Sequence, residues 1–284
     1  MNALRTLCTS ALLAASLLLG GCASNRVNLE EVREFADASA RLGGYAELST
    51  RYRDTYLREQ PYLPPAAEKV AKENDARRHA AYNDFVTIQK AVVLYMQTLS
   101  QLAGQGRYDF TPQIDTFSVG LSGMTDTTLG QKQVAAYTGL ARLLTRAITS
   151  HFQKESVETM VREGDADVRV LLEAMISLTD IYASAHENEK KTVLGFFDVA
   201  LPLADRPQDR LLYTLARAHA QAKTSEYRLV ERRIDLARQG LAKVAQGHQQ
   251  LRENLATMSS SEMRHMLSDV VRDLRLIRAG LASD

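Results

Sequence analysis

The chain of 284 residues contains no tryptophan, six prolines and two cysteines, and each scarcity excludes a class of protein. With only 15 glycines beside the six prolines, a fold rich in sheets and tight turns is not expected. Because Cys8 lies in an N-terminal apolar segment, the cysteines cannot form a disulfide framework. The sequence also has no zinc-protease motif, nucleophile elbow, phosphate loop or dinucleotide fingerprint. We therefore expect neither an enzyme nor a cofactor.

An excess of charge of either sign is missing as well. Lys and Arg number 35 and Asp and Glu number 34, and with Arg5 set aside in the N-terminal segment the two signs are equal. This balance removes the usual electrostatic reason to expect a nucleic acid partner. The 45% of hydrophobic and 24% of charged residues are typical of a globular chain rather than a disordered one.

The N-terminus has the organisation of an export signal. Arg5 is the only charge in residues 1–22, and the apolar run from Ala11 to Leu19 is too short for a membrane-spanning helix, which needs roughly 20 apolar residues. The run ends in Leu19-Gly20-Gly21-Cys22, which resembles the box of bacterial lipoproteins. That resemblance implies cleavage before Cys22 and acylation of its sulfur and its new amino group. Cys22 is therefore the expected site of lipid attachment.

Acylation would bind the protein to a membrane through its N-terminus and would cap its one remaining thiol. Ala23, rather than aspartate, follows the cysteine. In such lipoproteins this implies the outer membrane, with the protein facing the periplasm, where the host has an outer membrane. Two alternatives remain open: an ordinary signal peptide followed by a plain cysteine, and an uncleaved anchor.

The rest of the chain shows the period of helices. Apolar residues that recur every three or four positions form five seams, of the kind that packs against neighbouring helices. The seams comprise Phe85, Ile88, Val92, Tyr95, Leu99 and Leu102; Val134, Tyr137, Ala141, Leu144 and Ile148; Leu171, Met175, Leu178 and Tyr182; Leu241, Val244, His248, Leu251, Leu255 and Met258; and Met263, Met266, Val270, Leu274, Ile277 and Leu281. No long stretch alternates with the period of a strand. The sequence predicts an all-α fold.

Helix caps, glycines and prolines divide this body into about six helices. The expected helices cover about 29–60, 66–103, 129–163, 165–201, 208–257 and 260–284. Asn28 with Glu31, Thr128 with Gln131 and Ser259 with Glu262 have the spacing of capping boxes. Gly43-Gly44 is a weak point, and Gly164-Asp165 is the expected turn between the third and fourth helices. Short connections favour an elongated antiparallel bundle with one very long helix. The expected organisation is thus a signal peptide (1–21), a lipidated tether (22–27) and one helical domain (28–284).

Residues 105–128 form the one long irregular stretch, and they are unusually apolar. Tyr108, Phe110, Ile114 and Phe117 are our candidates for a surface that binds a partner or a ligand, because apolar loops on rigid scaffolds often do so. The alternative is that these side chains cover the end of the bundle core.

The six histidines do not indicate a metal site. Glu262-Met-Arg-His265 has the Glu-x-x-His spacing of di-iron bundles, but such a site needs the unit twice. His248 occupies a seam position, where a packed histidine is expected. The mixed charges between Arg228 and Arg238 favour a solvent-exposed face with pairs along the helix, and a ridge that binds a partner is the alternative.

The helical body has a tyrosine in the seam of residues 85–102, and this seam ends at Leu102-Ala103. In these features it is similar to helical lipoproteins of proteobacteria for which no activity is known. The resemblance implies a non-enzymatic envelope protein, in which the helices act as an interaction or scaffold module for other envelope proteins. The alternative is a protein that binds an apolar or amphipathic ligand near residues 105–128.

Overall fold

The computed structural model describes residues 29–41, 44–104, 130–149, 155–203, 207–255, 257 and 259–282. All regular structure within these ranges is helical and none is strand, which confirms the all-α fold class. The physical reason is the return of apolar side chains every three or four residues, which a helix places on one face. Among the described helices, none combines the length and the apolar character that crossing a membrane requires.

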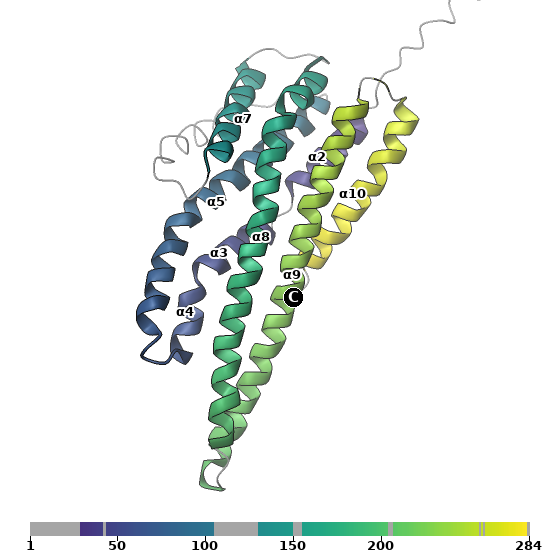
Figure 1. Ribbon diagram of the computed structural model, residues 1–284. Coiled ribbons are helices and arrows are strands. Elements are labelled where there is room, and N and C mark those ends of the chain that lie inside the picture. Colours follow the sequence, from purple (N-terminus) through teal and green to yellow (C-terminus); the bar gives the residue numbers. More distant parts are fainter. Residues whose placement is uncertain are drawn as a thin grey trace, which may run out of the picture.

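The elements follow one another as an elongated antiparallel bundle (Figure 1). The two longest described helices are α8 with 49 residues and α9 with 45, followed by α5 with 36. In chain order the elements are α2 (Leu29–Ala40), α3 (Gly44–Arg53), α4 (Thr55–Glu59), the 3-10 helix η1 (Gln60–Tyr62), α5 (Glu68–Ala103), α7 (Gln131–Thr149), α8 (Glu155–Leu203), the 3-10 helix η2 (Pro207–Asp209), α9 (Arg210–Asn254) and α10 (Ser260–Ala282).

The predicted turn at Gly164-Asp165 is wrong, because both residues lie inside α8. In the structure α7 ends at Thr149 and α8 begins at Glu155, before the predicted turn. A Cβ atom on Gly164 would lie 2.7 Å from Cε2 of Tyr95 and 3.0 Å from Cδ2 of Leu143. The glycine is therefore a position of close helix contact, and α8 is a second very long helix where the sequence predicted only one.

The first predicted helix is also divided further than expected, into α2, α3, α4 and η1. The weak point at Gly43-Gly44 is a real break. A Cβ atom on Gly44 would approach Cδ2 of Leu281 to 3.0 Å, so the small residue admits the end of α10 beside the start of α3. Asn28 and Thr128 lie outside the described residues. The third predicted capping box is present, since Glu262 accepts a hydrogen bond from the backbone N–H of Ser259 at 2.9 Å and donates its own N–H to the Ser259 hydroxyl at 3.4 Å.

One large core joins the helices from α2 to α10, and the predicted seams supply most of it. In α5, Ile88, Tyr95 and Leu99 are completely buried. The buried seam residues of the other helices are Tyr137, Ala141, Leu144, Leu171, Met175, Leu178, Tyr182, Leu241, Val244, His248, Leu251, Leu255, Met263, Val270, Leu274, Ile277 and Leu281. His248 is packed as predicted. Its Nε2 lies 2.8 Å from the Tyr95 hydroxyl, and its hydrogen bond to Asp165 holds the pKa of that carboxyl below its ordinary value.

Candidate functional site

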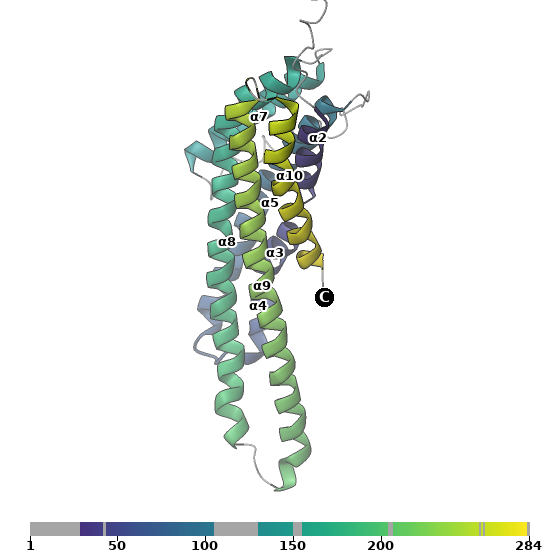
Figure 2. The same cartoon turned by 90° about the vertical axis from the view of Figure 1, so that its right-hand side faces the viewer.

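The lower parts of α8 and α9 extend beyond the other helices as an antiparallel hairpin (Figure 2). Only a small separate core holds this hairpin together. Val193, Phe197 and Tyr227 are its buried members, and partly buried residues such as Ala216 and Ala220 pack against them. Because two helices alone cannot enclose a large core, much of each helix surface stays in contact with water here.

Tyr62 of η1 packs against one side of the hairpin. Its ring centroid lies 5.6 Å from that of Phe196 and 5.5 Å from that of Phe197, both in α8. Its hydroxyl lies 2.8 Å from Nε2 of His219 in α9. Tyr62 therefore contacts both helices, and Phe196 and His219 mark the same side of the hairpin.

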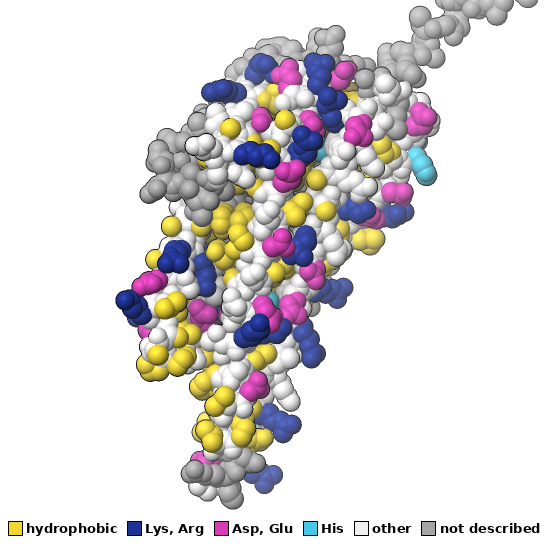
Figure 3. All heavy atoms as spheres, in the orientation of Figure 1, with side chains coloured by type: hydrophobic (Ala, Val, Ile, Leu, Met, Phe, Trp, Pro, Cys, Tyr) yellow, Lys and Arg dark blue, Asp and Glu magenta, His cyan; other side chains and the backbone are white. Residues whose placement is uncertain are grey.

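Beyond Tyr62, this side of the hairpin is apolar and uncovered by any described residue. Val199 and Leu203 follow Phe196 at the helical spacing i, i+3, i+7, and Leu212 and Leu215 precede His219 at the same spacing. Six of the ten large hydrophobic side chains that are exposed in the described residues lie here. We call them the tip face: Phe196 (44% exposed), Val199 (69%), Leu203 (73%), Leu211 (74%), Leu212 (62%) and Leu215 (60%). Figure 3 shows hydrophobic side chains gathered over this end of the molecule.

A buried polar cluster anchors the hairpin to the short N-terminal helices. The side chain of Glu189 in α8 is only 1% exposed. Arg58 of α4 donates to both of its oxygens, from Nε at 2.9 Å and from Nη2 at 2.8 Å. Arg51 of α3 donates to Oε1 at 3.3 Å, and the Tyr227 hydroxyl of α9 donates to the same oxygen at 3.2 Å. One carboxylate thus joins four helices just above the tip.

His186 lies one turn before Glu189 and borders the same cluster. It is 5% exposed, and its ring packs edge-on against Tyr227 with centroids 5.2 Å apart. Burial, with a smaller contribution from the positive charge of Arg51, holds the pKa of His186 below its ordinary value. The histidine is therefore neutral near pH 7, as a packing residue would be.

The charged residues of α9 pair across the hairpin as well as along the helix. Lys190 of α8 donates to Glu231 at 2.6 Å, and Arg238 of α9 pairs with Asp180 of α8. Arg238 also lies 3.8 Å from Asp235 on its own helix. These pairs account for part of the mixed-charge pattern by contacts within the molecule.

None of the candidate residues predicted from the sequence is among the residues that the structure describes. Cys22, Tyr108, Phe110, Ile114 and Phe117 all lie outside the described residues, as does the whole of the alternative ligand region 105–128. Within the described residues, no group of histidine, cysteine and acidic side chains could hold a metal ion. Glu262 instead acts as a helix cap, and the Ser259 hydroxyl lowers the pKa of its carboxyl.

The tip face escaped the sequence analysis although a signal for it exists. Val199 and Leu203 precede the link between two long helices, and Leu211 and Leu212 follow it. A link between helices normally lies in water and is flanked by polar residues. Large aliphatic residues on both sides of Pro202 and Pro207 were therefore the available sign of an exposed apolar surface.

The chain matches no known protein-family model, and neither a curated protein nor a solved structure is significantly similar to it.

Proposed function

We propose that this protein is a lipid-anchored envelope protein that binds a helical segment of a second envelope protein through its tip face. The observation that supports the binding role most strongly is the concentration of exposed aliphatic residues on one side of the hairpin tip. Clustered apolar surface of this kind is costly to leave in water and is typical of interaction sites. The lipid anchor rests on Leu19-Gly20-Gly21-Cys22.

The geometry of the tip favours a helix as the bound element. In α8 the apolar side chains recur at i, i+3 and i+7, and in α9 Leu211 and Leu212 lie four and three positions before Leu215, which are spacings that pack against another helix. The two rows together form a surface that a third amphipathic helix can cover. Covering six side chains that are about two-thirds exposed removes on the order of 400 Å² of apolar surface from water on this side alone.

The positions of the anchor and the tip fit this role. Glu31, in the first turn of α2, is bound by Arg264 near the start of α10, and α10 begins where α9 ends. The N-terminal end of α2 therefore lies at the opposite end of α9 from the tip (Figure 1). The 45 residues of α9 span roughly 70 Å at the usual rise of a helix. A protein attached through Cys22 would present its tip face far from the membrane that holds it.

The anchor predicts a simple labelling result. In cells of the host, wild-type protein should incorporate a labelled fatty acid, and Cys22→Ser should lose the label, because the acceptor thiol is gone. Fractionation should then find the variant as a precursor that keeps its signal segment. Retention of the label by Cys22→Ser would disprove attachment at this residue.

The tip face is tested by site-specific photo-crosslinking in intact cells. A photoreactive residue at Leu203 or Leu212 should form an adduct with one and the same protein, and the crosslinked peptide should be an amphipathic helix. A photoreactive residue at Gln221, which is exposed on the same helix α9, should not form this adduct. Adducts with lipid, or with a second copy of this chain, would contradict the proposed partner.

A matched set of variants completes the test. Leu203→Ser combined with Leu215→Ser should reduce the yield of the adduct at Leu212 by at least tenfold, because two apolar contacts are removed. Both side chains are exposed, so the folded state should keep its thermal midpoint. Leu276→Ser is the control, since Leu276 is 65% exposed on α10, away from the tip. Equal adduct yields in the tip variant and this control would disprove binding through the tip face.

A further inference from the structure

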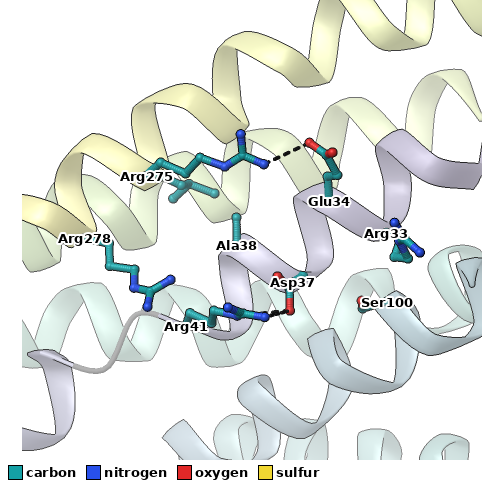
Figure 4. A pocket seen from close by; sticks show the side chains of 9 residues that line it. Arg33, Glu34, Asp37, Ala38, Arg41, Ser100, Arg275 and Arg278 are labelled. Carbon is teal, nitrogen blue, oxygen red and sulfur yellow. Dashed lines mark hydrogen bonds and ion pairs between the residues drawn. The ribbon is translucent and has the colours of Figure 1, made fainter.

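A hollow lies on the flank of the bundle, between α2 and α10, and it differs chemically from the apolar tip face. It has a volume of about 460 Å³ and is lined mainly by charged side chains. Arg33 and Arg41 come from α2, Arg275 and Arg278 come from α10, and Ser100 of α5 lies at one edge (Figure 4). Its size falls within the range of small-molecule sites.

Two of the four arginines are neutralised within the hollow. Arg41 donates to Oδ1 of Asp37 from Nε at 3.1 Å and from Nη2 at 2.8 Å. Arg275 donates to Oε2 of Glu34 at 3.0 Å. Arg33 and Arg278 form no ion pair with any of the residues that the structure describes. Since guanidinium groups stay protonated in proteins, the lining has two positive charges in excess.

The hollow lies among these charged side chains, and Figure 4 shows how they are placed around it. Arg275, Arg278 and Arg41 surround the small side chain of Ala38, and Arg33 lies on the other side of Asp37, next to Ser100 (Figure 4). Arg275 and Arg278 lie three positions apart and therefore share one face of α10. Planar guanidinium groups on two helices can each donate two hydrogen bonds to one tetrahedral anion.

From this arrangement we propose that the hollow binds a phosphate monoester, whose two negative charges match the two unpaired arginines. Arg278 and Arg33 supply the attraction, Arg41 and Arg275 border the anion, and the Ser100 hydroxyl offers a further hydrogen bond. The phosphate belongs either to a soluble metabolite or to a lipid headgroup, and both would present the same group. This site is independent of the tip face and of the function proposed for it.

The first test uses full-length protein in neutral detergent with glycerol 3-phosphate as the probe. Titration calorimetry should detect binding of one molecule, and sodium chloride at equal ionic strength should not reproduce the heat. The double variant Arg33→Gln, Arg278→Gln should weaken binding at least tenfold. Arg272→Gln is the control, because Arg272 is also an exposed arginine of α10 but does not line the hollow. It should change the affinity less than twofold.

Vesicles separate the two sources of phosphate. If a lipid headgroup is the natural ligand, protein should float with vesicles containing phosphatidic acid in preference to phosphatidylcholine, and the double variant should lose this preference. If binding is confined to soluble glycerol 3-phosphate, the ligand is a metabolite. Absence of binding to both probes, or an equal loss in Arg272→Gln and the double variant, would overturn the proposal. A tip-face variant should bind both probes normally, so the failure of one proposal does not imply failure of the other.

Discussion

Replacing Glu189 by alanine should lower the free energy of unfolding by about 3 kcal/mol, as expected when one partner of a buried ion pair is removed. The side chain is 1% exposed and accepts hydrogen bonds from Arg58, Arg51 and Tyr227. Its loss leaves the two guanidinium groups and a buried hydroxyl without their acceptor. Both arginines are 21% exposed, and Arg51 keeps its ion pair with Glu226 in the variant. The loss of unfolding free energy should therefore fall at the lower end of the range for breaking a buried ion pair.

Urea unfolding followed by circular dichroism measures this loss, with Glu187→Ala as the control. Glu187 lies two residues away on the same helix but is 42% exposed and pairs with Lys190 at the surface, where such pairs contribute little. The unfolding free energy of Glu189→Gln should lie between those of Glu189→Ala and Glu187→Ala, because the amide oxygen still accepts a hydrogen bond while the charge is lost. If Glu189→Ala is no more destabilising than Glu187→Ala, the cluster does not join the hairpin to the N-terminal helices as described.

Leu99→Ala should destabilise the bundle by about 2–5 kcal/mol, the range for truncating a fully buried leucine. Leu99 is 0% exposed and lies in the core that connects α5 with its neighbouring helices. Truncation removes apolar contacts and leaves a cavity that rigid neighbouring helices fill only in part. The matched comparison is Gln97→Ala in the same helix, where the side chain is exposed and the free energy should stay within about 0.5 kcal/mol. Equal chemical-denaturation midpoints for the two variants would show that the seam of α5 is misplaced.

The features that the sequence predicts well are those that depend on neighbours along one helix. The apolar seams and the Ser259–Glu262 cap follow from spacings of three and four residues, which fix positions on a helix surface. Burial of His248 follows from the same rule, since it occupies a seam position among Val244 and Leu251.

The errors concern features that depend on contacts between distant segments. Gly164 followed by an aspartate is typical of a turn, but the side chain is absent because the Tyr95 ring lies against the backbone of α8. No local pattern distinguishes these two uses of glycine. The Glu189 cluster is equally invisible to local spacing, since Arg51 and Arg58 are more than a hundred residues from their acceptor. The large aliphatic residues beside the link between α8 and α9 indicated the tip face, but which side of the hairpin stays uncovered depends on where Tyr62 packs.

The pairing of α2 with α10 has a consequence for the order in which the chain acquires its structure. Glu31 and Arg264 are 233 residues apart, and Glu34 and Arg275 are 241 residues apart. Contacts of such separation close a very large loop, so they form late compared with the α8–α9 hairpin, whose helices are almost adjacent in sequence. α2 can pack against α5, which is close to it in sequence, but the side of α2 that faces α10 stays uncovered until that last helix has been made. During that interval the uncovered side of α2 is apolar surface that other molecules have to protect.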